Sequence, residues 1–68
     1  MRIKIIEEFI KLDSLLKFAG VASTGGHAKI LILKGQIKVN GEVCLLRGKK
    51  IRKDDIVNFE DLEITVEN

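Results

Sequence analysis

The sequence predicts a single α+β domain in which two helices pack on one side of a small antiparallel sheet. Residues 12–19 and 28–35 repeat apolar side chains at the spacing of one helix face. Residues 1–6, 37–43 and 62–67 alternate apolar and polar side chains, as half-buried strands do. With 68 residues, of which 46% are hydrophobic and 32% charged, the chain can build one core and no second one.

The first half of the chain contains one predicted strand and both predicted helices. The alternation over residues 1–6 indicates a short strand that pairs with a distant segment. A helix follows from Leu12, and Gly20 is placed to end it. Thr24 is a residue type that begins helices, and the apolar series after it predicts a second helix to about Lys34.

The second half is predicted to be mainly strands. Asn40 and Gly41 accept the positive φ angles of a tight hairpin turn, with Lys38 directed away from the core. Residues 47–53 are expected to form a basic loop with Ile51 as its apolar anchor. The strands 56–59 and 62–67 complete the sheet.

Single-residue counts exclude several kinds of chemistry. Cys44 and His27 are each the only residue of their type, so no disulfide forms within the chain and the four ligands of a structural zinc site are missing. No catalytic constellation accompanies these two residues, so we expect a non-enzyme without metal or cofactor. Without a leader or an apolar run near the roughly 18 residues of a membrane span, we expect a cytoplasmic protein.

The aromatic residues give little indication of base stacking. The chain has three Phe and neither Trp nor Tyr. Spacing places Phe18 and Phe59 with the core rather than on an exposed face. We therefore expect a nucleic-acid partner to be recognised by shape and phosphate contacts more than by stacked bases.

Charge is segregated along the chain although the net charge is only +2. Residues 29–53, the basic tract, hold eight Lys and Arg against one acid, whereas residues 54–68 hold six acids and no base. Such a tract attracts a polyanion, and nucleic acid is the leading candidate. The simpler alternative is that these side chains only solvate a surface.

Two parts of the sequence are candidates for phosphate contacts. Thr24, Gly25 and Gly26 open the second helix, whose first N–H groups favour an anion; the alternative is a sharp turn capped by Thr24. His27 and Lys29 follow in the same helix. The second part is the cation-rich loop, whose members are Arg47, Lys49, Lys50, Arg52 and Lys53. Pairing of these cations with Asp54, Asp55 or the final strand is the alternative, but exposed pairs contribute only about 0 to 1 kcal/mol.

Three runs of residues resemble the alpha-L RNA-binding domain, which is named for the small-subunit ribosomal protein S-four. They are LDSLLKFAG at 12–20, TGGHAK at 24–29 and GQIKVNG at 35–41. The small stand-alone bacterial YaaA-like and YbcJ-like members are most similar, because they share the Gly-Gly-x-Ala-Lys step and a basic loop like RGKK at 47–50. The resemblance covers roughly residues 10–59.

The resemblance implies binding of structured RNA, commonly ribosomal RNA, across the paired helices and the adjoining hairpin. This chain departs from many members in two places. It has Gly26 and His27 where longer members have Ser-Arg, and Asp54 and Asp55 where many have Gly-Asp. An Arg contact typical of the wider family is thus absent, and contacts from the backbone are expected there.

We therefore expect one monomeric RNA-binding domain over residues 1–68, with structured RNA as its partner, the ribosome as one candidate, and no membrane or small-molecule substrate. A protein adaptor with an acidic partner, or DNA binding, is the alternative. The predicted RNA-binding residues are Thr24, Gly25, Gly26, His27, Lys29, Lys34, Lys38, Arg47, Lys49, Lys50, Arg52 and Lys53.

Overall fold

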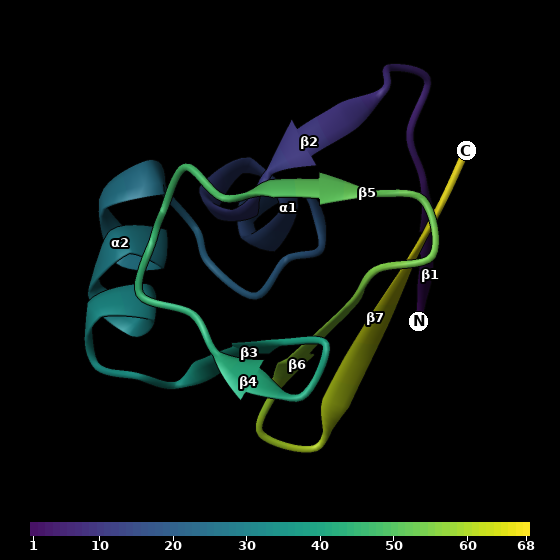
Figure 1. The fold of residues 1–68 in the computed structure, drawn as a ribbon. Coiled ribbons are helices and arrows are strands. Elements are labelled where there is room, and N and C mark those ends of the chain that lie inside the picture. Colours follow the sequence, from purple (N-terminus) through teal and green to yellow (C-terminus); the bar gives the residue numbers. More distant parts are fainter.

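The computed structural model describes residues 1–68 and contains two helices and seven short strands (Figure 1). In chain order the elements are β1 (Arg2–Lys4), β2 (Phe9–Lys11), α1 (Leu12–Phe18), α2 (Gly25–Leu33), β3 (Ile37–Val39), β4 (Glu42–Val43), β5 (Lys50–Arg52), β6 (Ile56–Phe59) and β7 (Leu62–Glu67). The predicted α+β class is confirmed. Neither helix is long and apolar enough to cross a membrane.

Five of the strands form one sheet in the order β1-β7-β6-β3-β4. Its neighbours are antiparallel except β1 and β7, which run parallel, with Arg2 opposite Thr65. The predicted pairing of the first strand with a distant segment is therefore confirmed. The sheet was predicted to be antiparallel, and the parallel pair at its edge differs from that prediction. A parallel pair needs a long crossover between its strands, and nearly the whole chain supplies it here.

The remaining two strands, β2 and β5, form a separate antiparallel pair, called the ribbon below. Ile10 lies opposite Ile51 and faces inward, and Ile51 is fully buried. The prediction of a loop over residues 47–53 is thus wrong at its centre, because burial of Ile51 draws β5 against β2. Figure 1 shows the ribbon beside α1, and β5 also contacts β7 of the large sheet.

The helices begin and end close to their predicted positions. Gly20 follows α1 with a φ of 79°, the left-handed conformation that a side chain disfavours. Thr24 caps α2, since its Oγ1 accepts a hydrogen bond of 3.0 Å from the His27 N–H. The two helices pack together through fully buried side chains of Leu12, Leu15, Leu16, Ala28 and Ile32.

The predicted hairpin joins β3 to β4, and its turn is linked to the turn that follows β5. Asn40 and Gly41 have φ angles of 51° and 86°, as the tight turn requires. The Asn40 Nδ2 donates to Asp55 Oδ1 at 3.0 Å, and its Oδ1 accepts from the Ile56 N–H at 2.9 Å. Asp55 Oδ2 in turn accepts from the Arg52 N–H at 2.8 Å. We call this bridge the Asn40–Asp55 clasp.

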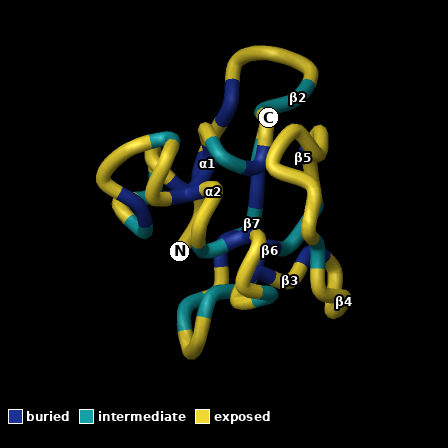
Figure 2. The backbone as a smooth tube through the Cα atoms, turned by 90° about the vertical axis from the view of Figure 1, so that its left-hand side faces the viewer, coloured by how far each residue is buried: buried dark blue, intermediate teal, exposed yellow.

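The core contains 14 buried residues, all of them apolar, which come from both helices, the ribbon, the large sheet and the connecting segments; Figure 2 shows a buried stretch along β7. Phe59 packs partly buried against this core, as predicted. Phe18 does not: it is 70% exposed, so its predicted burial is wrong. Ala19 continues the buried stripe of α1 instead, which turns Phe18 toward solvent.

Candidate nucleic-acid interface

The start of α2 is one of two places where predicted binding residues meet. Thr24 caps the helix, and the N–H groups of Gly25 and Gly26 belong to its first turn, where they have no acceptor within the helix. A Cβ added at Gly25 would lie 3.7 Å from Nη2 of Arg47. The guanidinium of the basic tract therefore lies beside the first turn of the helix, although the two are far apart in sequence.

Asp13, at the start of α1, holds Arg47 in this position. Its Oδ2 accepts a hydrogen bond of 3.0 Å from Arg47 Nε, and its backbone N–H donates to the Arg47 carbonyl at 3.1 Å. The Asp13 side chain is only 16% exposed, whereas that of Arg47 is 48% exposed. The pairing occupies Nε and leaves the Nη groups available to a ligand. Sequence reasoning missed Asp13, because an acid in a first helical turn is ordinary.

His27 presents a hydrogen-bond donor at the same end of α2. Its Nδ1 accepts from the Ser23 N–H at 3.2 Å, which assigns the proton of the neutral ring to Nε2. The imidazole is exposed, and so is Lys29 farther along the helix. Cys44, the other residue considered for catalysis, is half-buried and donates weakly from Sγ to the Leu46 carbonyl at 3.7 Å.

The ribbon is the second place where cations meet. Its outward face carries Lys11 directly opposite Lys50, and Phe9 directly opposite Arg52. The Lys50 Nζ lies 4.9 Å from the centroid of the Phe9 ring, and the Arg52 Cζ lies 5.6 Å from it. Both distances are typical of cation–π contacts. Lys11 precedes the basic tract in the sequence and was missed, because only the pairing of β2 with β5 brings it here.

The ribbon and the start of α2 are connected along the first turn of α1. The Leu12 N–H donates to the Lys49 carbonyl at 2.8 Å, and the Asp13 N–H bonds to the carbonyl of Arg47. Residues 47–49 therefore run from the start of α2 to β5 while bound to α1. The two cation groups lie at the ends of this bonded segment.

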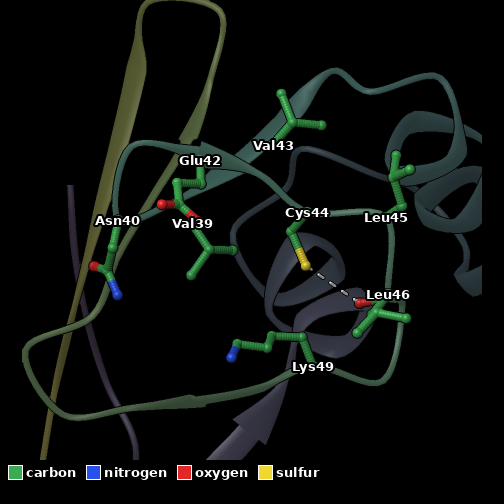
Figure 3. A pocket seen from close by; sticks show the side chains of 8 residues that line it. All are labelled: Val39, Asn40, Glu42, Val43, Cys44, Leu45, Leu46 and Lys49. Carbon is green, nitrogen blue, oxygen red and sulfur yellow. Dashed lines mark hydrogen bonds between the residues drawn. The ribbon is translucent and has the colours of Figure 1, made fainter.

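Other predicted residues lie apart from these two groups. Lys49 lines a hollow of about 440 Å³ beside the β3–β4 hairpin, where Figure 3 shows its side chain on the opposite wall from Val43. Lys38 lies on the exposed side of β3, and Lys34 follows the last residue of α2, at the end opposite Thr24. Lys53 lies near Glu7 and Glu8, in a depression beyond the ribbon.

Carboxylates pair with two of the predicted cations, but they are not the carboxylates expected from the sequence. Arg47 pairs with Asp13, and Arg52 Nη1 lies 3.1 Å from Oε1 of Glu8. The Glu8 side chain is 84% exposed, so this second pair is weak. Asp55 binds the backbone N–H of Arg52 rather than its guanidinium. Lys11 and Lys50 have no ion-pair partner.

Comparisons with known proteins give consistent results. Residues 3–67 match the family model described as the S4 domain. RlbA of Bacillus subtilis (strain 168), whose name refers to ribosome maturation, is 38% identical over 58 residues, which are 85% of this chain and 82% of RlbA. YbcJ of Escherichia coli (strain K12), whose name refers to RNA binding, is 37% identical over 57 residues, which are 84% of this chain and 81% of YbcJ.

A solved structure extends the likeness to the whole fold. The solution structure of Escherichia coli YbcJ superposes with a TM-score of 0.75 at 31% identity, covering 98% of this chain and 86% of that one. Its description refers to an alpha-L motif involved in RNA binding. The helix pair and hairpin predicted from residues 12–41 are thus shared with a protein of known structure.

Proposed function

The chain belongs to the S4 domain family, and on this basis we propose that it is a non-catalytic binding module for structured RNA. The module acts as one unit over residues 1–68 and as a monomer. The ribosome-maturation name of RlbA supports ribosomal RNA as the target and a cytoplasmic location. Phosphate groups, rather than base edges, supply most of the affinity.

The arrangement of Lys11 and Lys50 is the observation that carries this proposal. Like charges directly opposite each other on two strands destabilise the pairing. Here they occur on an exposed face without a carboxylate partner, and Arg52 lies on the same face. A phosphate bound between the two ammonium groups relieves the repulsion, so the ribbon has a physical reason to hold a polyanion.

The start of α2 provides a second contact, and the two together suit a folded RNA. The Arg47 guanidinium donates from its Nη groups beside Gly25, and His27 adds its Nε2–H. The segment leading into β5 is hydrogen-bonded to α1, and α2 packs against α1, so the spacing of the two sites changes little when a ligand binds. A ligand with phosphates at a fixed separation, such as an RNA helix, fits such a rigid pair of sites.

A salt titration of the intact protein with an RNA hairpin tests the proposal. If about four phosphates are neutralised, log affinity falls with log salt at a slope of about −3 to −4. A DNA hairpin of the same sequence and polyglutamate serve as controls. A flat salt response would refute the phosphate mechanism. Polyglutamate binding as tightly as RNA would instead favour an adaptor for acidic proteins, and DNA binding more tightly would make DNA the ligand.

A further inference from the structure

An apolar groove adjoins the ribbon and has no assigned role. It lies between the segment that joins β1 to β2 and the end of α1, and its volume is about 590 Å³. Its charged members are Lys4, Lys11 and Glu7, and its apolar lining consists of Ile5, Ile6, Phe9, Ile10 and Phe18. The volume is within the range of sites that hold small organic groups.

Two of the apolar residues that line the groove are unusually open to solvent. Ile6 is 96% exposed and Phe18 is 70% exposed, whereas Ile5, which also lines the groove, is buried. Figure 2 shows the segment between β1 and β2 as an exposed arch at one end of the molecule. Two large apolar side chains that face one groove at this exposure are typical of a surface that binds a partner.

The charge around the groove indicates what kind of partner fits. Two lysines line it against the single carboxylate of Glu7. Phe9 and Lys11 belong both to the groove and to the ribbon, where Lys50 and Arg52 lie over the Phe9 ring. The groove is therefore continuous with the proposed phosphate-binding face. A group that is flat and apolar and is attached to phosphates matches both parts.

We propose that the groove takes an unpaired nucleobase of the bound RNA, stacked on Phe18 with Phe9 as the opposite wall. The neighbouring phosphates then lie on Lys11 and Lys50. This inference rests on the proposed function and adds to it, because a paired helix alone offers no free base. Stacking tolerates any base, since every base has a π face, so the groove recognises an unpaired position rather than a sequence.

Two RNA hairpins with the same stem test the inference. One stem is fully paired, and the other carries one unpaired 2-aminopurine nucleotide, whose fluorescence falls when it stacks. The wild-type protein is expected to bind the second hairpin at least about fivefold more tightly and to quench its fluorescence. Equal affinity for both hairpins, without quenching, would overturn the inference and leave the proposed function intact.

Variants at Phe18 assign the effect to the groove. Because Phe18 is largely exposed, Phe18→Ala leaves the fold intact while removing both the preference and the quenching. Phe18→Tyr keeps both, and Phe18→Leu, which retains an apolar side chain without a ring, loses most of the quenching. Val43→Ala is the matched control, since Val43 is 52% exposed and lies outside the groove. A preference that survives Phe18→Ala would overturn the assignment.

Sedimentation of the free protein addresses the rival occupant, a second copy of this chain. A wild-type dimer that Phe18→Ala converts to a monomer would identify the groove as a self-association surface and overturn the inference. A monomer in both cases supports it. If neither hairpin binds at any salt concentration, the proposed function fails as well, an outcome distinct from binding without preference.

Discussion

The large sheet and the ribbon differ in what they contribute to this small domain: the first supplies more of the buried core, and the second supplies exposed cations. The large sheet contributes the fully buried residues Ile37, Val57, Ile64 and Val66, whereas the ribbon contributes Ile51 alone. The ribbon instead displays Lys11, Lys50 and Arg52 on its outward face. Repulsive charge is thus placed on the element that adds least to the core, and the comparison separates residues for stability from residues for binding.

Truncation in the large sheet is expected to have the largest effect. Ile64→Ala removes a fully buried side chain from β7 and costs about 2 to 5 kcal/mol of unfolding free energy. Since the stability of a domain this small is roughly 0.05 to 0.15 kcal/mol per residue, a large part of it is lost. Thermal denaturation followed by circular dichroism measures the change. A melting temperature equal to wild type would mean that the core of the large sheet contributes little.

Substitution in and beside the ribbon is expected to affect binding and spare stability. The double variant Lys49→Ala and Lys50→Ala lowers RNA affinity by about tenfold, because charge-assisted contacts to phosphate are lost. The salt slope falls by about 1 to 2 in magnitude. Since both lysines are exposed, the melting temperature stays within a few degrees of wild type. A large drop in melting temperature would show that this segment is structural instead.

The two single variants sharpen this prediction. Lys50 lies on the outward face opposite Lys11, while Lys49 lines the hollow beside the hairpin. Lys50→Ala is therefore expected to account for most of the loss measured in fluorescence-anisotropy titrations. Equal losses from the two single variants would place the hollow of Figure 3 on the RNA path as well.

The two paired arginines of the candidate interface, Arg47 and Arg52, give the smallest but most discriminating prediction. Asp13→Ala frees Arg47, which must then be ordered on binding at a cost of about 0.5 to 1.5 kcal/mol, so affinity falls about two- to tenfold. Glu8→Ala frees Arg52 from an exposed pair worth about 0 to 1 kcal/mol, so affinity rises by up to about fivefold. Both variants remove one negative charge.

Affinity changes of opposite sign in the two variants therefore separate the effect of orienting Arg47 from the effect of net charge. The affinities of both variants are compared at one salt concentration, and circular dichroism confirms that both are folded. An equal rise in affinity for the two would contradict the positioning role of Asp13, because it would show that Arg47 acts only through its charge.

Much of the fold was predictable, because its signals are local. The Asn40-Gly41 turn requires positive φ angles that few other residue pairs accept, and the spacing from Leu12 specifies one buried helix face. Thr24 marks the start of α2 by chemistry that involves only the next few residues. The structures that these local signals predict are present in the folded protein, because no distant residue favours a different local structure.

The ribbon was not predictable, because its two strands have three residues each and lie far apart in the sequence. No turn signal joins them, and the charge of residues 47–53 is equally typical of a solvated loop. The exposure of Phe18 was missed for a related reason: its position near Leu15 fits either face of a helix that ends there. The sequence therefore indicated single candidate residues of the site, whereas Lys11 and Asp13 could be assigned to it only from the tertiary structure.

The Asn40–Asp55 clasp has a mechanical consequence. It fastens one end of β5 to the hairpin turn, while the Leu12 N–H fastens the other end to the first turn of α1. Because its backbone is restrained at both ends, β5 holds the Cα positions of its cationic residues at a fixed spacing before any ligand arrives. The backbone therefore loses little freedom at the moment of contact, and the cost of ordering falls on the exposed side chains.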